Sequence, residues 1–318
     1  MKPFKLYSPT TVDEAAKILK DNADSAALAG GTELIHMMKQ NALPQPTVLV
    51  NLKTISGLDY IKEEGGALKI GANTKLVTIA SNSIVRSNYT ALAQAAARVA
   101  SPLIRNRGTI AGNLCQDVWC WYYRATDNLY NCIRKGGAIC YAQAGDNRYY
   151  HSIFGGPRGC YAVHPSDTAV ALTALDASAV TNSRTIAMKD LFQELAPGHT
   201  LQKGEIIEEI QVPTPASGSK SAFMKVAMRE SPDFAIASAA VWYSLSGGTV
   251  SDARIVLGGV YQTPRRATAA ESYIKGKAIN EDTATAAGQQ AVADATPMTQ
   301  NAFKKVLAAT MVKRALLA

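Results

Sequence analysis

Residues 26–39 read AALAGGTELIHMMK, a short apolar run that enters two glycines and continues in a helical pattern. Two glycines at the end of a strand let the backbone come close to a ligand. Free amides at the start of the next helix suit an anion such as a pyrophosphate. A plain strand–turn–helix connection has the same pattern, so these residues alone leave both interpretations open.

The segments around this stretch predict both strands and helices. Thr11 and Glu14 have the spacing of a capping box, which predicts a helix to about Asp21. Residues 46–52 resemble a buried strand, and residues 58–62 and 67–71 flank two glycines as a hairpin. Helices are expected over 91–99 and 168–175, the second capped by Ser166 or Asp167.

Residues 213–219 form a proline-, glycine- and serine-rich cluster, which indicates a domain boundary. Beyond it we expect strands at 222–228, 238–245 and 254–260, and helices at 267–274, 281–295 and 301–317. A small sheet with appended helices is typical of an α+β fold.

All five cysteines lie between Thr109 and Asp167, in a segment rich in turn-forming residues. Structural zinc sites usually pair cysteines two to four residues apart. Here only Cys115 and Cys120, with four residues between them, approach that spacing. The next intervals, to Cys132, Cys140 and Cys160, hold eleven, seven and nineteen residues. Wide spacing in an irregular loop favours a 4Fe-4S cluster, with zinc as the competing interpretation.

Composition excludes several classes of protein. The 318-residue chain is 47% hydrophobic and 18% charged, which is typical of a globular protein. It has no 18-residue apolar run and no signal-peptide pattern, so we expect a cytoplasmic protein without a membrane span. The net charge of +8 is spread along the chain, which argues against nucleic-acid binding and for a solvated or subunit-docking face. The four histidines are expected to be structural.

An ordered set of motifs resembles the FAD-binding medium subunit of the xanthine dehydrogenase, or molybdenum hydroxylase, family. The motifs are AGGTEL at 29–34, IGANT at 70–74, RNRGTIAGN at 105–113, SD at 166–167, GEII at 204–207, FMK at 223–225, LGGV at 257–260 and PRRA at 264–267. The resemblance implies a two-subdomain, PCMH-type FAD-binding domain over residues 1–215, with subdomains at about 1–55 and 56–215. A small α+β domain over 216–318 would follow.

The resemblance also assigns site residues. Leu28, Ala29, Gly30, Gly31 and Thr32 would hold the FAD pyrophosphate through backbone amides. The other implied cofactor contacts are Thr109, Gly112 and Asn113 in a second turn, Asp167 at sugar or ribityl hydroxyls, Ile206 and Ile207 beside the isoalloxazine, Lys225 near the flavin ring, and Thr74. No catalytic acid or base is expected.

The segment between Asn113 and Asp167 is longer than the short turn of most family members. It looks like the extra 4Fe-4S loop of the 4-hydroxybenzoyl-CoA reductase beta subunit. The resemblance then implies the ligands Cys120, Cys132, Cys140 and Cys160, at about 115–163, with Cys115 spare or exchanged for one of them. Since Asn113 and Asp167 would both contact the flavin, we expect the loop to leave them close in space.

The implied function is electron transfer through FAD and the 4Fe-4S cluster. The expected partners are a molybdopterin-binding large subunit, a small subunit with two 2Fe-2S clusters, and an external electron acceptor or donor. The complex would be a dimer of heterotrimers. The alternative is a self-sufficient flavin oxidase or dehydrogenase with a structural zinc loop.

Overall fold

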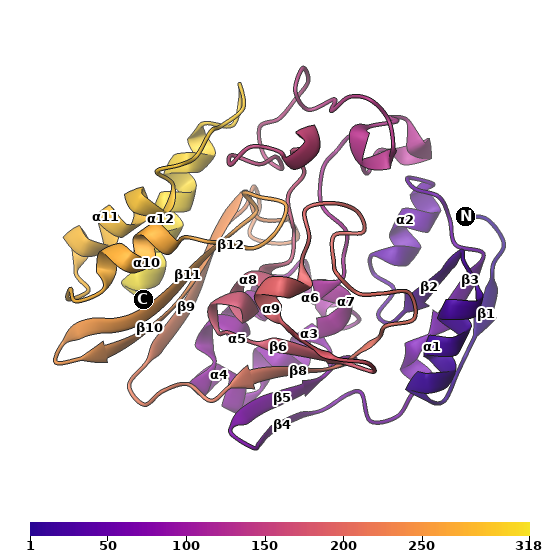
Figure 1. Cartoon of the computed structure of the whole chain (residues 1–318), viewed down its shortest axis with the longest axis horizontal. Helices are drawn as coiled ribbons and strands as arrows, with labels where there is room; N and C mark the ends of the chain where they lie inside the picture. Colours follow the sequence, from indigo (N-terminus) through magenta and orange to yellow (C-terminus); the bar gives the residue numbers. More distant parts are fainter.

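The computed structural model describes residues 1–318, which form three β-sheets separated by helices (Figure 1). The first sheet is parallel, in the order β1-β3-β2, with strands β1 (Lys5–Tyr7), β2 (Ser25–Leu28) and β3 (Val48–Asn51). Helices α1 (Val12–Asp21) and α2 (Leu34–Gln40) connect these strands. Thr11 caps α1 by accepting a hydrogen bond from the Glu14 amide at 3.2 Å, as the sequence predicts.

The second sheet is antiparallel, in the order β4-β5-β8-β6-β7. Its strands are β4 (Ile61–Glu64), β5 (Ala67–Gly71), β6 (Ser178–Thr181), β7 (Thr185–Ala187) and β8 (Ile207–Pro213). The associated helices are α3 (Leu76–Ser81), α4 (Ser83–Asn88), α5 (Thr90–Arg98), α6 (Pro102–Arg105), α7 (Ile110–Leu114), α8 (Asp167–Ala174) and α9 (Met188–Leu191). The predicted hairpin is present as β4 and β5.

The third sheet, in the order β12-β11-β10-β9, is antiparallel and begins after the 213–219 cluster. It contains β9 (Lys220–Val226), β10 (Ala237–Ser246), β11 (Thr249–Gly258) and β12 (Arg265–Arg266). Helices α10 (Thr268–Ile274), α11 (Glu281–Ala291) and α12 (Phe303–Leu316) cover its outer face. This architecture confirms the predicted α+β fold class.

Helices α5 and α8 lie between the second and third sheets (Figure 1). Their large side chains, such as Leu92 and Leu172, join the core of the second sheet. Their small residues face the third sheet, where Ala95 and Val170 pack with Phe223. Every residue of α8 is buried, so this helix has no solvent face.

The cysteine-rich insertion is irregular, with three short 3₁₀ turns at Thr126–Asn128, Ile133–Lys135 and Pro157–Gly159. It crosses the top of the view in Figure 1, between α2 and the C-terminal helices. Contacts hold both of its sides: Lys135 Nζ donates to the Ala42 carbonyl at 3.1 Å, and Lys304 Nζ donates to the Tyr149 carbonyl at 2.8 Å. None of the helices combines the length and the apolar character that a membrane span requires.

Candidate functional site

The two glycine turns of the sequence lie against each other. A Cβ atom at Gly30 would stand 2.3 Å from the Arg107 carbonyl oxygen, so only glycine permits this approach. Gly31 has φ +74°, in the left-handed region that favours glycine. At Gly108, a Cβ would lie 3.8 Å from the Thr32 hydroxyl. The segments 28–32 and 105–109 therefore form one paired turn.

The first turn exposes unused hydrogen-bond donors. The backbone amides of residues 29–33 donate to no acceptor within the protein, although they lie between β2 and the start of α2. Adjacent free amides in a turn form a concave site for an anion. The arrangement suits a diphosphate, which accepts several hydrogen bonds at once.

Two cations flank this turn, and neither was singled out from the sequence. Lys53 Nζ donates to the Ala29 carbonyl at 2.9 Å. Burial lowers the pKa of Lys53, and the nearby positive charge of Arg107 lowers it further. The positive charges of Lys53 and Arg107 repel each other, and an anion bound beside them would relieve that repulsion. Because Lys53 follows β3 in sequence, only the folded sheet brings it to the turn.

The second turn is joined to the start of α8 across the insertion. Thr109 caps α7 by accepting from the Gly112 amide at 3.3 Å. The Asn113 side-chain oxygen accepts from Ser166 Oγ at 2.7 Å and from Thr168 Oγ1 at 2.5 Å. These two hydroxyls flank Asp167, so the predicted proximity of Asn113 and Asp167 is confirmed. Ser166, not Asp167, is the helix cap.

Asp167 and Lys225 form a buried ion pair, with Asp167 Oδ2 and Lys225 Nζ 2.7 Å apart. Their side chains are 4% and 1% exposed. Lys225 Nζ also donates to the Arg98 carbonyl at 2.9 Å. Burial raises the pKa of Asp167, whereas the charge of Lys225 opposes that shift. The charged state of Asp167 therefore depends on Lys225.

The remaining predicted contacts are buried and already packed. Thr74 is fully buried, and its hydroxyl bonds both the amide and the carbonyl of Tyr60, at 3.1 and 3.0 Å. Ile206 packs in the core of the first sheet, and Ile207 packs in the core of the second. These neighbouring isoleucines therefore face different cores, which the sequence motif does not show.

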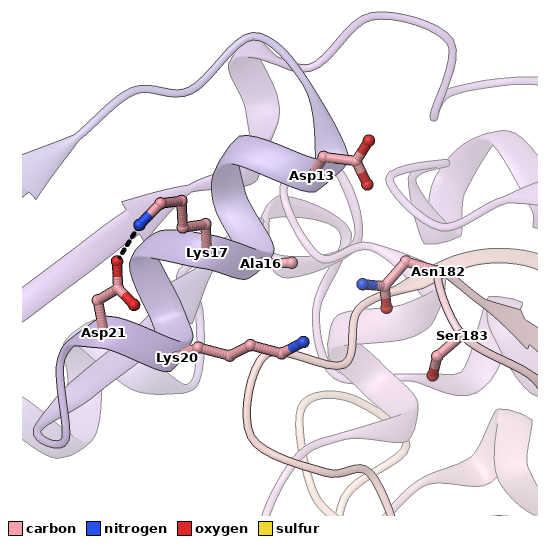
Figure 2. A pocket seen from close by; sticks show the side chains of 7 residues that line it. All are labelled: Asp13, Ala16, Lys17, Lys20, Asp21, Asn182 and Ser183. Atoms are coloured by element: carbon pink, nitrogen blue, oxygen red, sulfur yellow. Dashed lines mark hydrogen bonds and ion pairs between the residues drawn. The ribbon is translucent and has the colours of Figure 1, made fainter.

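A cavity of about 400 Å³ lies elsewhere, between α1 and the turn that joins β6 to β7. Figure 2 shows charged side chains of α1, among them Lys20 and Asp13, on one side and Asn182 and Ser183 on the other. None of the predicted cofactor contacts lines it. Its open, polar lining offers nothing for a flavin ring to pack against.

Four cysteines of the insertion gather in one group, in which Cys140 is half-buried and the other three are buried. Cys120, Cys132 and Cys160 belong to a small core with Val118 and Tyr123. Burial, aided by the neighbouring Cys160 and Cys140, raises the pKa of Cys120 to about 12. Burial also raises the pKa of Cys160, with further contributions from Cys140 and Cys132. The predicted ligand residues are therefore mutual neighbours in the fold.

Cys115 lies apart from this group. It packs against the core of the second sheet, at the end of α7. None of the five cysteines forms a disulfide. No group of three or more histidine, cysteine, aspartate or glutamate side chains is arranged to hold a single metal ion.

Three cations lie beside the cysteine group, two with buried side chains (Arg124 and Arg134) and one half-buried (Lys135). Arg134 pairs with Asp117 at 3.2 Å, and its positive charge lowers the pKa of Cys160 in opposition to burial. Arg124 pairs with Glu33, the residue after the first glycine turn, and donates to the Val118 carbonyl at 2.8 Å. Burial lowers the pKa of Lys135, which the charges of Cys132 and Cys120 oppose. The insertion therefore touches the glycine turn through one ion pair.

Comparisons with protein families match the chain almost end to end. Residues 2–215 match the family described as the FAD binding domain in molybdopterin dehydrogenase. Residues 222–318 match the CO dehydrogenase flavoprotein C-terminal domain.

Individual proteins give the same result. The aldehyde oxidoreductase FAD-binding subunit PaoB of Escherichia coli is 34% identical over 97% of this chain and 95% of that protein. The carbon monoxide dehydrogenase medium chain of Hydrogenophaga pseudoflava is 31% identical over 98% of this chain and 96% of its own length. The solved structure of the carbon monoxide dehydrogenase from that organism superposes with a TM-score of 0.79, covering 100% of this chain and 97% of that one.

Proposed function

Since this chain belongs to the FAD-binding subunits of the molybdenum hydroxylase family, which are oxidoreductase subunits, we propose that it relays electrons through FAD held at the paired glycine turns. The observation that carries the proposal is the row of free amides at residues 29–33, with Lys53 beside it. Bound FAD would take up and release electrons, which is the cofactor's own chemistry. The protein supplies position and charge.

Each predicted contact then has a proposed role. Leu28 to Thr32 would hold the diphosphate through their backbone, and Thr109, Gly112 and Asn113 would line the second turn. Asp167 would accept from cofactor hydroxyls, while Lys225 would place positive charge near the ring. Ile206 and Ile207 would lie beside the isoalloxazine ring, although most of each side chain packs in a core. The Thr74 hydroxyl already bonds Tyr60, so Thr74 would act by shaping the turn.

We further propose that Cys120, Cys132, Cys140 and Cys160 hold a 4Fe-4S cluster. A zinc ion draws all four sulfurs to one point. A cubane takes each sulfur on a different iron, so its ligands stand farther apart. The four thiols that neighbour one another in the insertion are the donors that such a cluster takes, and they support this proposal. Arg134 and Lys135 would offset part of the negative charge of the cluster.

The partners follow from the family. We propose a molybdopterin-binding large subunit, a small subunit with two 2Fe-2S clusters, and assembly as a dimer of heterotrimers. An external electron acceptor or donor would exchange electrons with this subunit. The domain division proposed is 1–215 for FAD and 216–318 for the C-terminal domain, with subdomains meeting near residue 55.

The isolated chain tests this function. We expect it to bind FAD, to show flavin and iron–sulfur absorbance, and to oxidise no organic substrate by itself. Turnover of a small organic substrate without partner subunits would instead establish the self-sufficient flavin oxidase or dehydrogenase.

Replacing Lys53 with Met is expected to weaken FAD binding on the order of tenfold, or about 1.4 kcal/mol, because a cation beside the diphosphate is lost. The dissociation constant is measured by quenching of flavin fluorescence at several salt concentrations. The variant should also respond less to salt, since screening acts on the charge that was removed. Lys39→Met, at an exposed lysine of α2, is the matched control and should bind FAD as the native chain does.

Replacing Cys132 with Ser is expected to deplete iron, whereas Cys115→Ser should keep about four irons per chain, the content of a cubane held by four thiolates. Iron and zinc are measured by elemental analysis after anaerobic purification. Stoichiometric zinc without iron in the native chain would contradict the cluster and support a structural zinc loop.

A further inference from the structure

His151 is buried against one of the proposed cluster ligands. Its Nε2 lies 3.3 Å from Cys120 Sγ, and the side chain is fully inaccessible to solvent. Its other ring nitrogen, Nδ1, is buried and has no hydrogen-bond partner. The only polar contact of this imidazole is therefore the cysteine sulfur.

The chemistry of the pair decides which atom carries the proton. A cysteine that binds iron does so as a thiolate, which has no proton and can only accept a hydrogen bond. The Nε2 atom must then be the donor, with its proton directed at the sulfur. The contact becomes a charge-assisted hydrogen bond to a cluster ligand.

The rest of the fold holds His151 in this position. Its carbonyl oxygen accepts from Lys304 Nζ, in the first turn of α12, at 2.8 Å and from Asn301 Nδ2, just before that helix, at 3.3 Å. The rings of Trp121 and Tyr122 lie 6.3 and 6.1 Å from the imidazole, centroid to centroid. The imidazole is thus anchored by the C-terminal domain and enclosed by the insertion.

We propose that His151 is a positioning residue that raises the reduction potential of the 4Fe-4S cluster by donating a hydrogen bond from Nε2 to Cys120 Sγ. This inference rests on the proposed cluster. Reduction adds one electron and makes the sulfur ligands more negative, so a donor stabilises the reduced form more than the oxidised form. Hydrogen bonds to ligand sulfur are one of the means by which proteins set these potentials.

The test compares His151→Leu, which removes the donor, with His151→Gln, which keeps an N–H group. The potential is measured by redox titration followed by electron paramagnetic resonance, with iron content determined on the same samples. We expect His151→Leu to keep about four irons and to be reduced about tenfold less readily, a fall of about 59 mV for one electron. His151→Gln should restore part of the shift. His36→Leu, at an exposed histidine of α2, is the control and should leave the potential unchanged.

An unchanged potential in an iron-replete His151→Leu variant would overturn the proposal. Loss of iron from both variants would also overturn it, because His151 would then be a ligand or a structural requirement. If His151→Leu does not fold, the native chain labelled with ¹⁵N-histidine still decides. A weak nitrogen coupling to the reduced cluster supports a hydrogen bond, and a strong one indicates an iron–nitrogen bond and overturns it. A native chain without iron refutes the cluster itself and is a separate result.

Discussion

Replacing Lys225 with Met is expected to lower the free energy of unfolding by about 3–5 kcal/mol, the usual cost of leaving one member of a buried ion pair alone. Asp167 would remain at the start of α8 with its carboxylate buried and without its cation. The loss should be smaller at acidic pH than at neutral pH. Without Lys225, burial raises the pKa of Asp167 further, so the carboxyl protonates and tolerates burial.

Urea unfolding of the purified chain measures this effect. The double variant Lys225→Met with Asp167→Asn removes both charges and should recover most of the lost stability. If the double variant is as unstable as the single one, the ion pair is not the cause and packing around Lys225 is. If the single variant unfolds as the native chain does, the buried pair contributes nothing measurable.

Replacing Gly30 with Ala is expected to raise the FAD dissociation constant roughly ten- to hundredfold, since overpacking costs about 1–3 kcal/mol. The new Cβ would stand 2.3 Å from the Arg107 carbonyl, a backbone atom that moves only if the second turn moves. Separating the turns would disturb the diphosphate site directly. Flavin content after purification and fluorescence titration with added FAD measure the change.

Gly108→Ala, in the second of the two paired turns, tests a milder clash than Gly30→Ala. Its Cβ would meet the Ile104 carbonyl at 3.2 Å, which needs a shift of only a few tenths of an ångström. A smaller effect than at Gly30 is therefore expected. Equal affinity in the native chain and in Gly30→Ala would show that the two turns do not hold FAD together.

Local signals in the sequence account for the elements with strong periodicity and caps. The Thr11 cap, the β4–β5 hairpin and the β10–β11 pair through Ser246 to Gly248 follow from short-range chemistry. The sequence does not predict the short helices α3, α4 and α6 or the strands β6 and β7. Each spans six residues or fewer, so tertiary packing and not periodicity determines it.

The candidate site shows the same division. The proximity of Asn113 to Asp167 could be predicted because the two motifs frame one insertion. The pairing of Asp167 with Lys225 could not, because it joins residues of different domains. The position of Lys53 at the first turn could not either, because it depends on how two strands of the first sheet pair. Ile206 and Ile207 form one apolar motif in the sequence, yet they pack in different cores, Ile206 just before β8 and Ile207 at its first residue.

Helix α8 is buried on both faces, which matters when the chain is cut at the 213–219 cluster. A fragment that ends near residue 215 would lack Phe223, Ala240 and Val256, which cover Val170 and Ala171 on the helix. The uncovered face of α5 and α8 would be a continuous apolar surface, the kind that leads isolated fragments to aggregate. The 213–219 cluster marks a domain boundary in the sequence. It is nevertheless a poor place at which to truncate the protein for expression.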